Sequence, residues 1–169
     1  QGWQGALPFR YHIGPGPTRV RLKVADDRET NGYKEIWNTL AWVRGSERPD
    51  EWVVIGAHRD TWGAGAADNG RGTASVLAPA RAVAELVRDG IRPRRTLVFA
   101  TWDAEEWGII GSTEWVEELA DELGARAVAY LNQDGVAGGP YFNAGASPSL
   151  KQLIREAARV VPSPQGGSV

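Results

Sequence analysis

The chain has 169 residues, of which 42% are hydrophobic and 24% charged, and its net charge is −2. This length and composition predict one globular domain, and the near-neutral charge argues against nucleic acid binding. No apolar run reaches membrane-spanning length, and the absence of cysteine excludes disulfides and thiolate metal sites.

Two features of the sequence suggest that the chain is a piece of a longer protein. It begins with Gln1 and contains no methionine. Residues 162–169 are rich in Gly, Pro and Ser, which is typical of a linker. We therefore expect both ends to continue in a parent protein.

The first third of the chain predicts coil followed by three strands. Residues 1–17 are rich in Gly and Pro and are expected to be irregular. Residues 18–24 alternate apolar and polar side chains, as in an antiparallel strand, and 35–44 predict a second strand. The continuous apolar run 52–57 is typical of a central strand that is covered on both faces.

The rest of the chain alternates between predicted helices and strands. A helix is expected over 73–89, with Pro79 bending it or displacing its start and Gly90 as its C-cap. The later elements are a strand at 96–102, a helix at 113–123, strands at 126–132 and 141–144, and an amphipathic helix near 150–161. This order predicts an α/β fold of three layers, α/β/α, with a mostly parallel mixed sheet that is incomplete at both ends and has the N-terminal strands as its antiparallel edge.

One imidazole and several carboxylates follow the predicted strands 52–57, 96–102 and 126–132. They are His58 and Asp60, then Asp68 in a glycine-rich loop, Glu105 and Glu106, and Asp134. The carboxyl ends of strands form the ligand crevice of an open α/β sheet. Carboxylates gathered without a cation repel and raise each other's pKa, so the pattern predicts a metal site of hydrolytic type.

Each of these residues also has an ordinary structural interpretation. His58 and Asp60 fit a simple hydrogen-bonded pair, Glu105 and Glu106 fit a solvated helix start, and Asp68 and Asp134 fit turns. Their joint occurrence at the ends of successive strands favours the metal site. His12, in the coil before the first strand, is interpreted as structural.

Several motifs resemble the zinc peptidase family of glutamate carboxypeptidase II, also called N-acetylated-alpha-linked acidic dipeptidase, to which the transferrin receptor is related. The motifs lie at 54–62 with Asp68, 92–96, 102–108, 111–115 and 130–134. The resemblance covers nearly all of residues 1–160. It implies a zinc exopeptidase-like fold, with part of the catalytic domain at 1–161 and a linker-like tail at 162–169. The family's protease-associated and C-terminal helical domains would lie outside this chain.

The resemblance also implies roles for the residues. Two zinc ions would be held by His58, Asp68, Glu106 and Asp134, with Asp68 bridging them. Glu105 would be the general base, and Asp60 would orient His58 by accepting its second N–H. The imidazole and carboxylate donors agree with zinc chemistry.

The activity implied is hydrolysis of a terminal peptide bond by a metal-activated water, with a peptide or acyl-dipeptide substrate and a homodimeric parent. Carboxypeptidase and aminopeptidase both stay open, because residues 141–145 lack the arginine that helps acidic-substrate enzymes bind their substrate. Two alternatives are a non-catalytic binding module like the transferrin receptor and an amidohydrolase. The location is left open, although the resemblance suggests a secreted or periplasmic protein.

The second zinc ion of the family needs a histidine from a later loop, and no histidine follows Asp134. We therefore expect this chain to bind at most one zinc ion tightly and to be catalytically silent by itself.

Overall fold

The computed structural model describes residues 6, 8, 14–17, 19–26, 30, 32–139, 141–163 and 165–169. The chain divides into two compact units, Gln1–Glu35 and Ile36–Val169. The second unit contains β1 (Thr39–Val43), β2 (Arg48–His58), α2 (Arg71–Arg88), β3 (Arg95–Trp102), α3 (Ile110–Glu118), α4 (Ala120–Arg126), β4 (Ala127–Asn132) and α5 (Lys151–Val160). No helix in the described part of the chain is long and apolar enough to cross a membrane.

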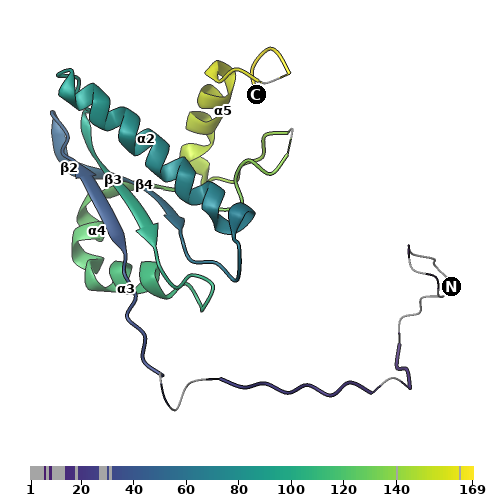
Figure 1. Ribbon diagram of the computed structural model, residues 1–169. Coiled ribbons are helices and arrows are strands. Elements are labelled where there is room, and N and C mark those ends of the chain that lie inside the picture. The colour runs from purple at the N-terminus through teal and green to yellow at the C-terminus, as the bar shows by residue number, and fades with distance from the viewer. Residues whose placement is uncertain are drawn as a thin grey trace. The chain divides into compact units, whose positions relative to one another are not determined.

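The four strands form one sheet in the order β1-β3-β2-β4 (Figure 1). Strands β3 and β4 run parallel to β2, and β1 is the antiparallel edge beside β3. In this register His58 pairs with Trp102 and Gly56 with Asn132. The three parallel strands therefore end at the same edge of the sheet, and the predicted mostly parallel α/β fold is confirmed.

Helices cover both faces of this sheet, because the central strands are apolar on both sides. On one face Val54, Val98 and Trp102 pack against Trp115 of α3. On the other face Ala57 and Phe99 pack against Val76 of α2, and Figure 1 shows α2 crossing that face. The sheet with its two helical coats forms the three layers expected.

Helix α2 starts two residues earlier than predicted and runs unbroken through Pro79. It ends one residue earlier than predicted, at Arg88, and the C-cap is Asp89; Gly90 follows it with a left-handed φ of 86°. The Gly90 N–H donates to Val87 O at 3.1 Å and the Ile91 N–H donates to Leu86 O at 2.9 Å. These two bonds satisfy carbonyls that the helix leaves open at its end.

Two strand predictions were wrong. The described residues 19–24 form no strand, and Val20, Leu22 and Val24 are 75–88% exposed. An alternating pattern produces a strand only where a neighbouring strand takes up the backbone hydrogen bonds, and the described residues of Gln1–Glu35 supply no such neighbour. Residues 141–144 are also irregular, and no described strand pairs with them.

The predicted helix over 113–123 is in fact two helices. Leu119 separates α3 from α4 with φ −107° and ψ 26°, outside helical geometry. Gly124 lies inside α4 instead of ending the helix. Leu119 and Leu123 both pack against the core under α3. The spacing of apolar residues therefore continues across the break, and the sequence pattern gives no sign that the helix is interrupted.

The described part of the tail 162–169 folds back on itself. Pro162 and Ser168 form an isolated antiparallel bridge, and the Val169 N–H donates to Val161 O at 3.1 Å. The predicted second strand at 35–44 is present in shorter form as β1. His12 lies outside the described residues.

Candidate metal centre

The carboxyl edge of the sheet brings together groups that are far apart in the sequence. His58 is the last residue of β2 and is only 4% exposed. Its Nε2 lies 3.1 Å from Asp68 Oδ1, 3.5 Å from Asp134 Oδ1 and 3.9 Å from Glu105 Oε2. Asp68 comes from the irregular turn Ala66–Gly70 before α2, and Asp134 follows β4.

Three of these residues converge closely enough to share one cation. One ligand atom each from His58, Asp68 and Asp134 lies within 4.8 Å of the others. An imidazole nitrogen with two carboxylate oxygens is a donor set that suits zinc, which catalytic sites commonly bind through three protein ligands. The residues present therefore fit the ion that the sequence predicts.

The His58 ring is oriented from its other side. Its Nδ1 lies 3.1 Å from the backbone oxygen of Asp60 and 3.4 Å from Asp60 Oδ1. If Nδ1–H donates there, Nε2 is left as a lone-pair donor toward the two aspartates. Burial is the largest single influence and lowers the pKa of His58. The charges of Glu105 and Asp134, together with the hydrogen bond and charge of Asp60, raise it, and the net result is a raised pKa.

The carboxylate of Asp60 also accepts hydrogen bonds from the loop after β3, which the sequence did not predict. Its Oδ1 accepts the backbone N–H of Glu105 at 3.0 Å, and its Oδ2 accepts that of Glu106 at 3.1 Å. Asp60 thus holds the loop after β3 against the end of β2. The nearest acceptor for the histidine is the backbone oxygen of Asp60, so its carboxylate mainly fixes the glutamate pair.

Glu106 lies outside the group of three but close to it. Its pKa is raised, first by desolvation and then by the charge of Asp68, with a smaller contribution from Glu105. The charge of His58 and, to a smaller extent, a hydrogen bond from the Trp62 side chain act in the opposite direction. The rings of Trp62 and Trp107 contact each other in a tilted arrangement, with centroids 4.9 Å apart, and both residues are more than two-thirds exposed.

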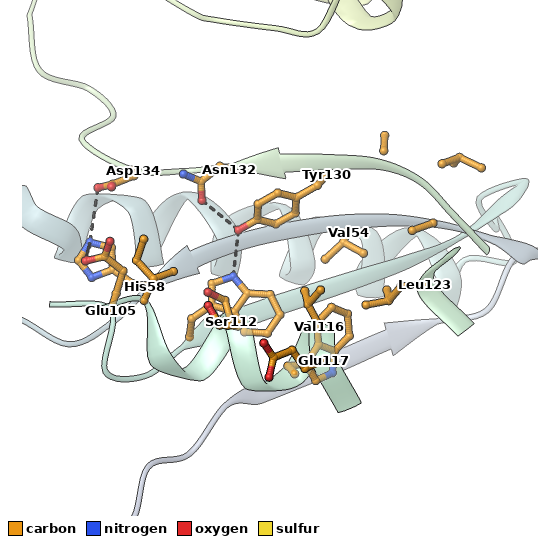
Figure 2. A pocket seen from close by; sticks show the side chains of 17 residues that line it. Val54, His58, Glu105, Ser112, Val116, Glu117, Leu123, Tyr130, Asn132 and Asp134 are labelled. Carbon is orange, nitrogen blue, oxygen red and sulfur yellow. Dashed lines mark hydrogen bonds and ion pairs between the residues drawn. The ribbon is translucent and has the colours of Figure 1, made fainter. Parts of the chain in front are cut away.

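A cavity of about 760 Å³ begins at the group and extends along the sheet (Figure 2). His58, Glu105 and Asp134 lie at one end, and mainly apolar side chains of α3, α4 and β4 line the rest. In its wall Trp102 Nε1 donates to the Tyr130 hydroxyl at 2.9 Å, which donates to Asn132 Oδ1 at 2.9 Å. An apolar cavity with a few convergent polar groups is typical of ligand sites.

The comparison with protein families decides the assignment. Residues 38–169, well over half of the chain, match the model of peptidase family M28. The chain belongs to peptidase family M28. This confirms the resemblance that the motifs at 54–62 and 102–108 indicated.

Relatives with different names share this M28 segment. A probable glutamate carboxypeptidase from Arabidopsis thaliana is 43% identical over 94% of the chain, and transferrin receptor protein 2 from Homo sapiens is 43% identical over 97%. A peptidase M28 precursor from Shewanella amazonensis has a similar structure, with a TM-score of 0.61 and 32% identity over 78% of the chain. The chain spans only 23%, 20% and 29% of the length of these three proteins.

Proposed function

We propose that the parent protein is a zinc metallopeptidase that hydrolyses a terminal peptide bond, and that this chain carries much of its metal site. The convergence of His58, Asp68 and Asp134 at the carboxyl edge of the sheet carries the proposal. Membership of a peptidase family and the glutamate carboxypeptidase relatives support it.

In this mechanism His58, Asp68 and Asp134 would hold the first zinc ion, and Glu106 together with Asp68 would contribute to a second. Bound zinc supplies Lewis-acid polarisation of the substrate carbonyl and lowers the pKa of a water. Glu105 takes a proton from the attacking water and returns it to the leaving amine. Its carboxylate lies 3.9 Å from His58 Nε2, beside the ligand group, which leaves it available for that transfer.

The second zinc position is incomplete in this chain. Glu106 and the shared Asp68 are two protein ligands, whereas a catalytic zinc ion normally has three. No histidine follows Asp134 to supply another. The chain by itself is therefore proposed to bind at most one zinc ion tightly and to be inactive. The parent is proposed to complete the site with a later histidine and, separately, to be a homodimer.

Substrate choice between an acidic dipeptide and an ordinary amino-terminal peptide is open to experiment. Residues 141–145 carry no basic side chain, which disfavours recognition of an acidic group from that segment. The relatives named glutamate carboxypeptidase favour the opposite choice.

A non-catalytic binding module is the second candidate function, because a transferrin receptor protein is among the relatives. A binding module has no need for the imidazole and the four carboxylates together. Their joint presence favours the peptidase.

The test is the zinc content and hydrolytic activity of the full-length parent. Aminoacyl substrates are compared with N-acyl dipeptides that end in glutamate, with Glu105→Gln as the catalytic control. Hydrolysis of either class that is lost in Glu105→Gln supports the proposal. A correctly folded, zinc-loaded parent that hydrolyses neither class would contradict the peptidase proposal and favour a binding module or an amidohydrolase.

A further inference from the structure

One buried side chain fastens the loop of Asp68 to the loop of Asp134. Asn69 is 0% exposed. Its Nδ2 donates to the backbone oxygen of Gln133 at 3.0 Å, and its Oδ1 accepts the backbone N–H of Gly72 at 3.1 Å. One amide atom thus closes the turn into α2, while the other reaches the chain just beyond β4.

The close approach at this point is built into the backbone. A Cβ on Gly72 would lie 2.0 Å from Gln133 O and 2.2 Å from Asn69 Oδ1, so only glycine fits. The Gln133 N–H donates to Gly56 O at 2.8 Å. Both backbone polar groups of Gln133 are therefore held, one by β2 and the other by Asn69.

The bond joins the two aspartates by a very short route. Asn69 directly follows Asp68, and Gln133 directly precedes Asp134. The two carboxylates lie within 4.8 Å of each other, and like charges at this distance repel when no cation is bound. Their separation in the metal-free protein therefore depends on the backbone that carries them.

We propose that Asn69 is a positioning residue that presets Asp68 and Asp134 for metal binding by tying their two loops together. It does not touch the ion and acts only through its neighbours in the chain. The inference rests on the proposed function for the identity of the ion as zinc. The hydrogen bonds of Asn69 join only protein atoms.

Two substitutions separate the cross-loop bond from the bond inside the turn. Asn69→Ser keeps a short acceptor for the Gly72 N–H, as serine does at helix starts, but cannot reach Gln133 O. Asn69→Ala loses both bonds. A role in folding alone would make Asn69→Ala much worse than Asn69→Ser, whereas positioning makes the two variants similar in metal affinity.

Thr96→Val is the matched control at the opposite edge of the sheet. Thr96 is 4% exposed, and its Oγ1 donates to Pro49 O at 2.7 Å and accepts the Gly45 N–H at 3.1 Å. This residue has the same double role as Asn69 but contacts no group of the candidate metal centre. Its loss lowers stability without moving Asp68 or Asp134.

The first measurement is the affinity of the chain for Zn²⁺, by competition with a chromophoric chelator. Loss of a residue that orients metal ligands typically weakens affinity about 10- to 100-fold, and we expect this for both Asn69 variants. Thr96→Val should bind as the unmodified chain does. Unmodified affinity in Asn69→Ser, or an equal loss in Thr96→Val, would overturn the inference.

The second measurement needs no metal. Amide hydrogen exchange in the metal-free chain should become roughly 2- to 10-fold faster over both 66–72 and 133–137 in Asn69→Ser, the effect of one lost hydrogen bond. Unchanged exchange in either segment would overturn the inference. If the unmodified chain bound no zinc but both segments responded together, the zinc proposal would fail while the loop connection stood.

Discussion

Most acidic side chains at the amino edge of the sheet pair with arginine, whereas those around His58 at the carboxyl edge do not. At the amino ends of the parallel strands, three acidic residues pair with arginine: Glu47 with Arg94 at 2.7 Å, Glu51 with Arg95 at 2.5 Å, and Asp50 with Arg126. At the carboxyl ends, Asp68, Glu105 and Asp134 share the single imidazole of His58. Among the described residues no lysine or arginine forms an ion pair with these three.

The pKa directions follow this difference. The hydrogen bond from Arg95 lowers the pKa of Glu51, whereas desolvation and the charge of Asp68 raise the pKa of Glu106. A neutralised carboxylate contributes to the fold, and an uncompensated one retains the capacity to bind a cation or a proton. At the carboxyl edge Asp103 is also paired, with Arg59 at 3.0 Å. Arginine pairing thus distinguishes structural carboxylates from Asp68, Glu105 and Asp134.

The largest expected effect is on catalytic activity, compared between one substitution at each edge. Glu105→Gln in the full-length parent should lower kcat by about two to four orders of magnitude while zinc content is retained, because the amide cannot accept the proton of water. Glu51→Gln, at the arginine-paired edge, should leave kcat unchanged. Near-normal turnover in Glu105→Gln would remove Glu105 from the role of base.

The second test compares how much zinc stabilises the folded chain when one aspartate at each edge is substituted. At free zinc about 100 times its Kd, a ligand that binds only the folded state stabilises it by about 2.7 kcal/mol. Asp68→Asn should abolish most of this gain, because a neutral amide oxygen is a poor zinc ligand. Asp50→Asn, which removes a carboxylate that pairs with arginine, should keep it. Thermal unfolding of the 169-residue chain with zinc and with chelator measures both, and equal gains in the two variants would contradict the assignment of Asp68.

The pH dependence of stability should have opposite signs at the two edges in the metal-free chain. Since the pKa of Glu106 is raised, the folded state retains its proton more readily, and stability falls as pH rises above 4.5 through the folded value. Since the pKa of Glu51 is lowered, its stabilising contribution is present above 4.5 and is lost as pH falls through the folded value.

Urea unfolding across a pH series that begins below 4.5 tests this contrast. Glu106→Gln should reduce the loss of stability toward high pH, and Glu51→Gln should reduce the loss toward low pH. The same change of slope in both variants would show that the two edges do not differ in charge compensation.

The smallest expected effect concerns a single surface pair. Arg94 and Glu47 are both more than half exposed, and pairs of this kind contribute about 0–1 kcal/mol. Arg94→Met should therefore change the free energy of unfolding by no more than about 1 kcal/mol, with a smaller change at high salt. A larger loss in urea unfolding would indicate that the pairs at this edge act as a connected network.

The fold could be predicted where burial alone decides the structure. The apolar runs at 52–57, 96–102 and 126–132 are strands, because a parallel sheet covered by helices is apolar on both faces. The alternation at 18–24 indicated an amphipathic segment but carried no information about a partner strand. The break at Leu119 was also invisible, since leucine favours a helix.

The grouping of the candidate site could be predicted because parallel strands end at one edge. That reasoning placed His58, Asp68 and Asp134 together, and their roles stay predictions. The contacts of Asp60 and Asn69 could not be foreseen. They involve backbone groups 45 and 64 residues away, and such contacts leave no trace in residue type or spacing.

The exposure of the aspartates at the carboxyl edge should also affect the rate at which a cation binds. The side chains of Asp68 and Asp134 are 68% and 43% exposed, so their negative field reaches into solvent. A concentrated field of one sign attracts small ions of the opposite sign and raises their association rate, within a screening distance of about 8 Å at physiological salt. The aspartates that are proposed to bind a divalent cation would therefore also attract it from solution. The association rate of the cation should then fall with added salt, even where its final coordination is unchanged.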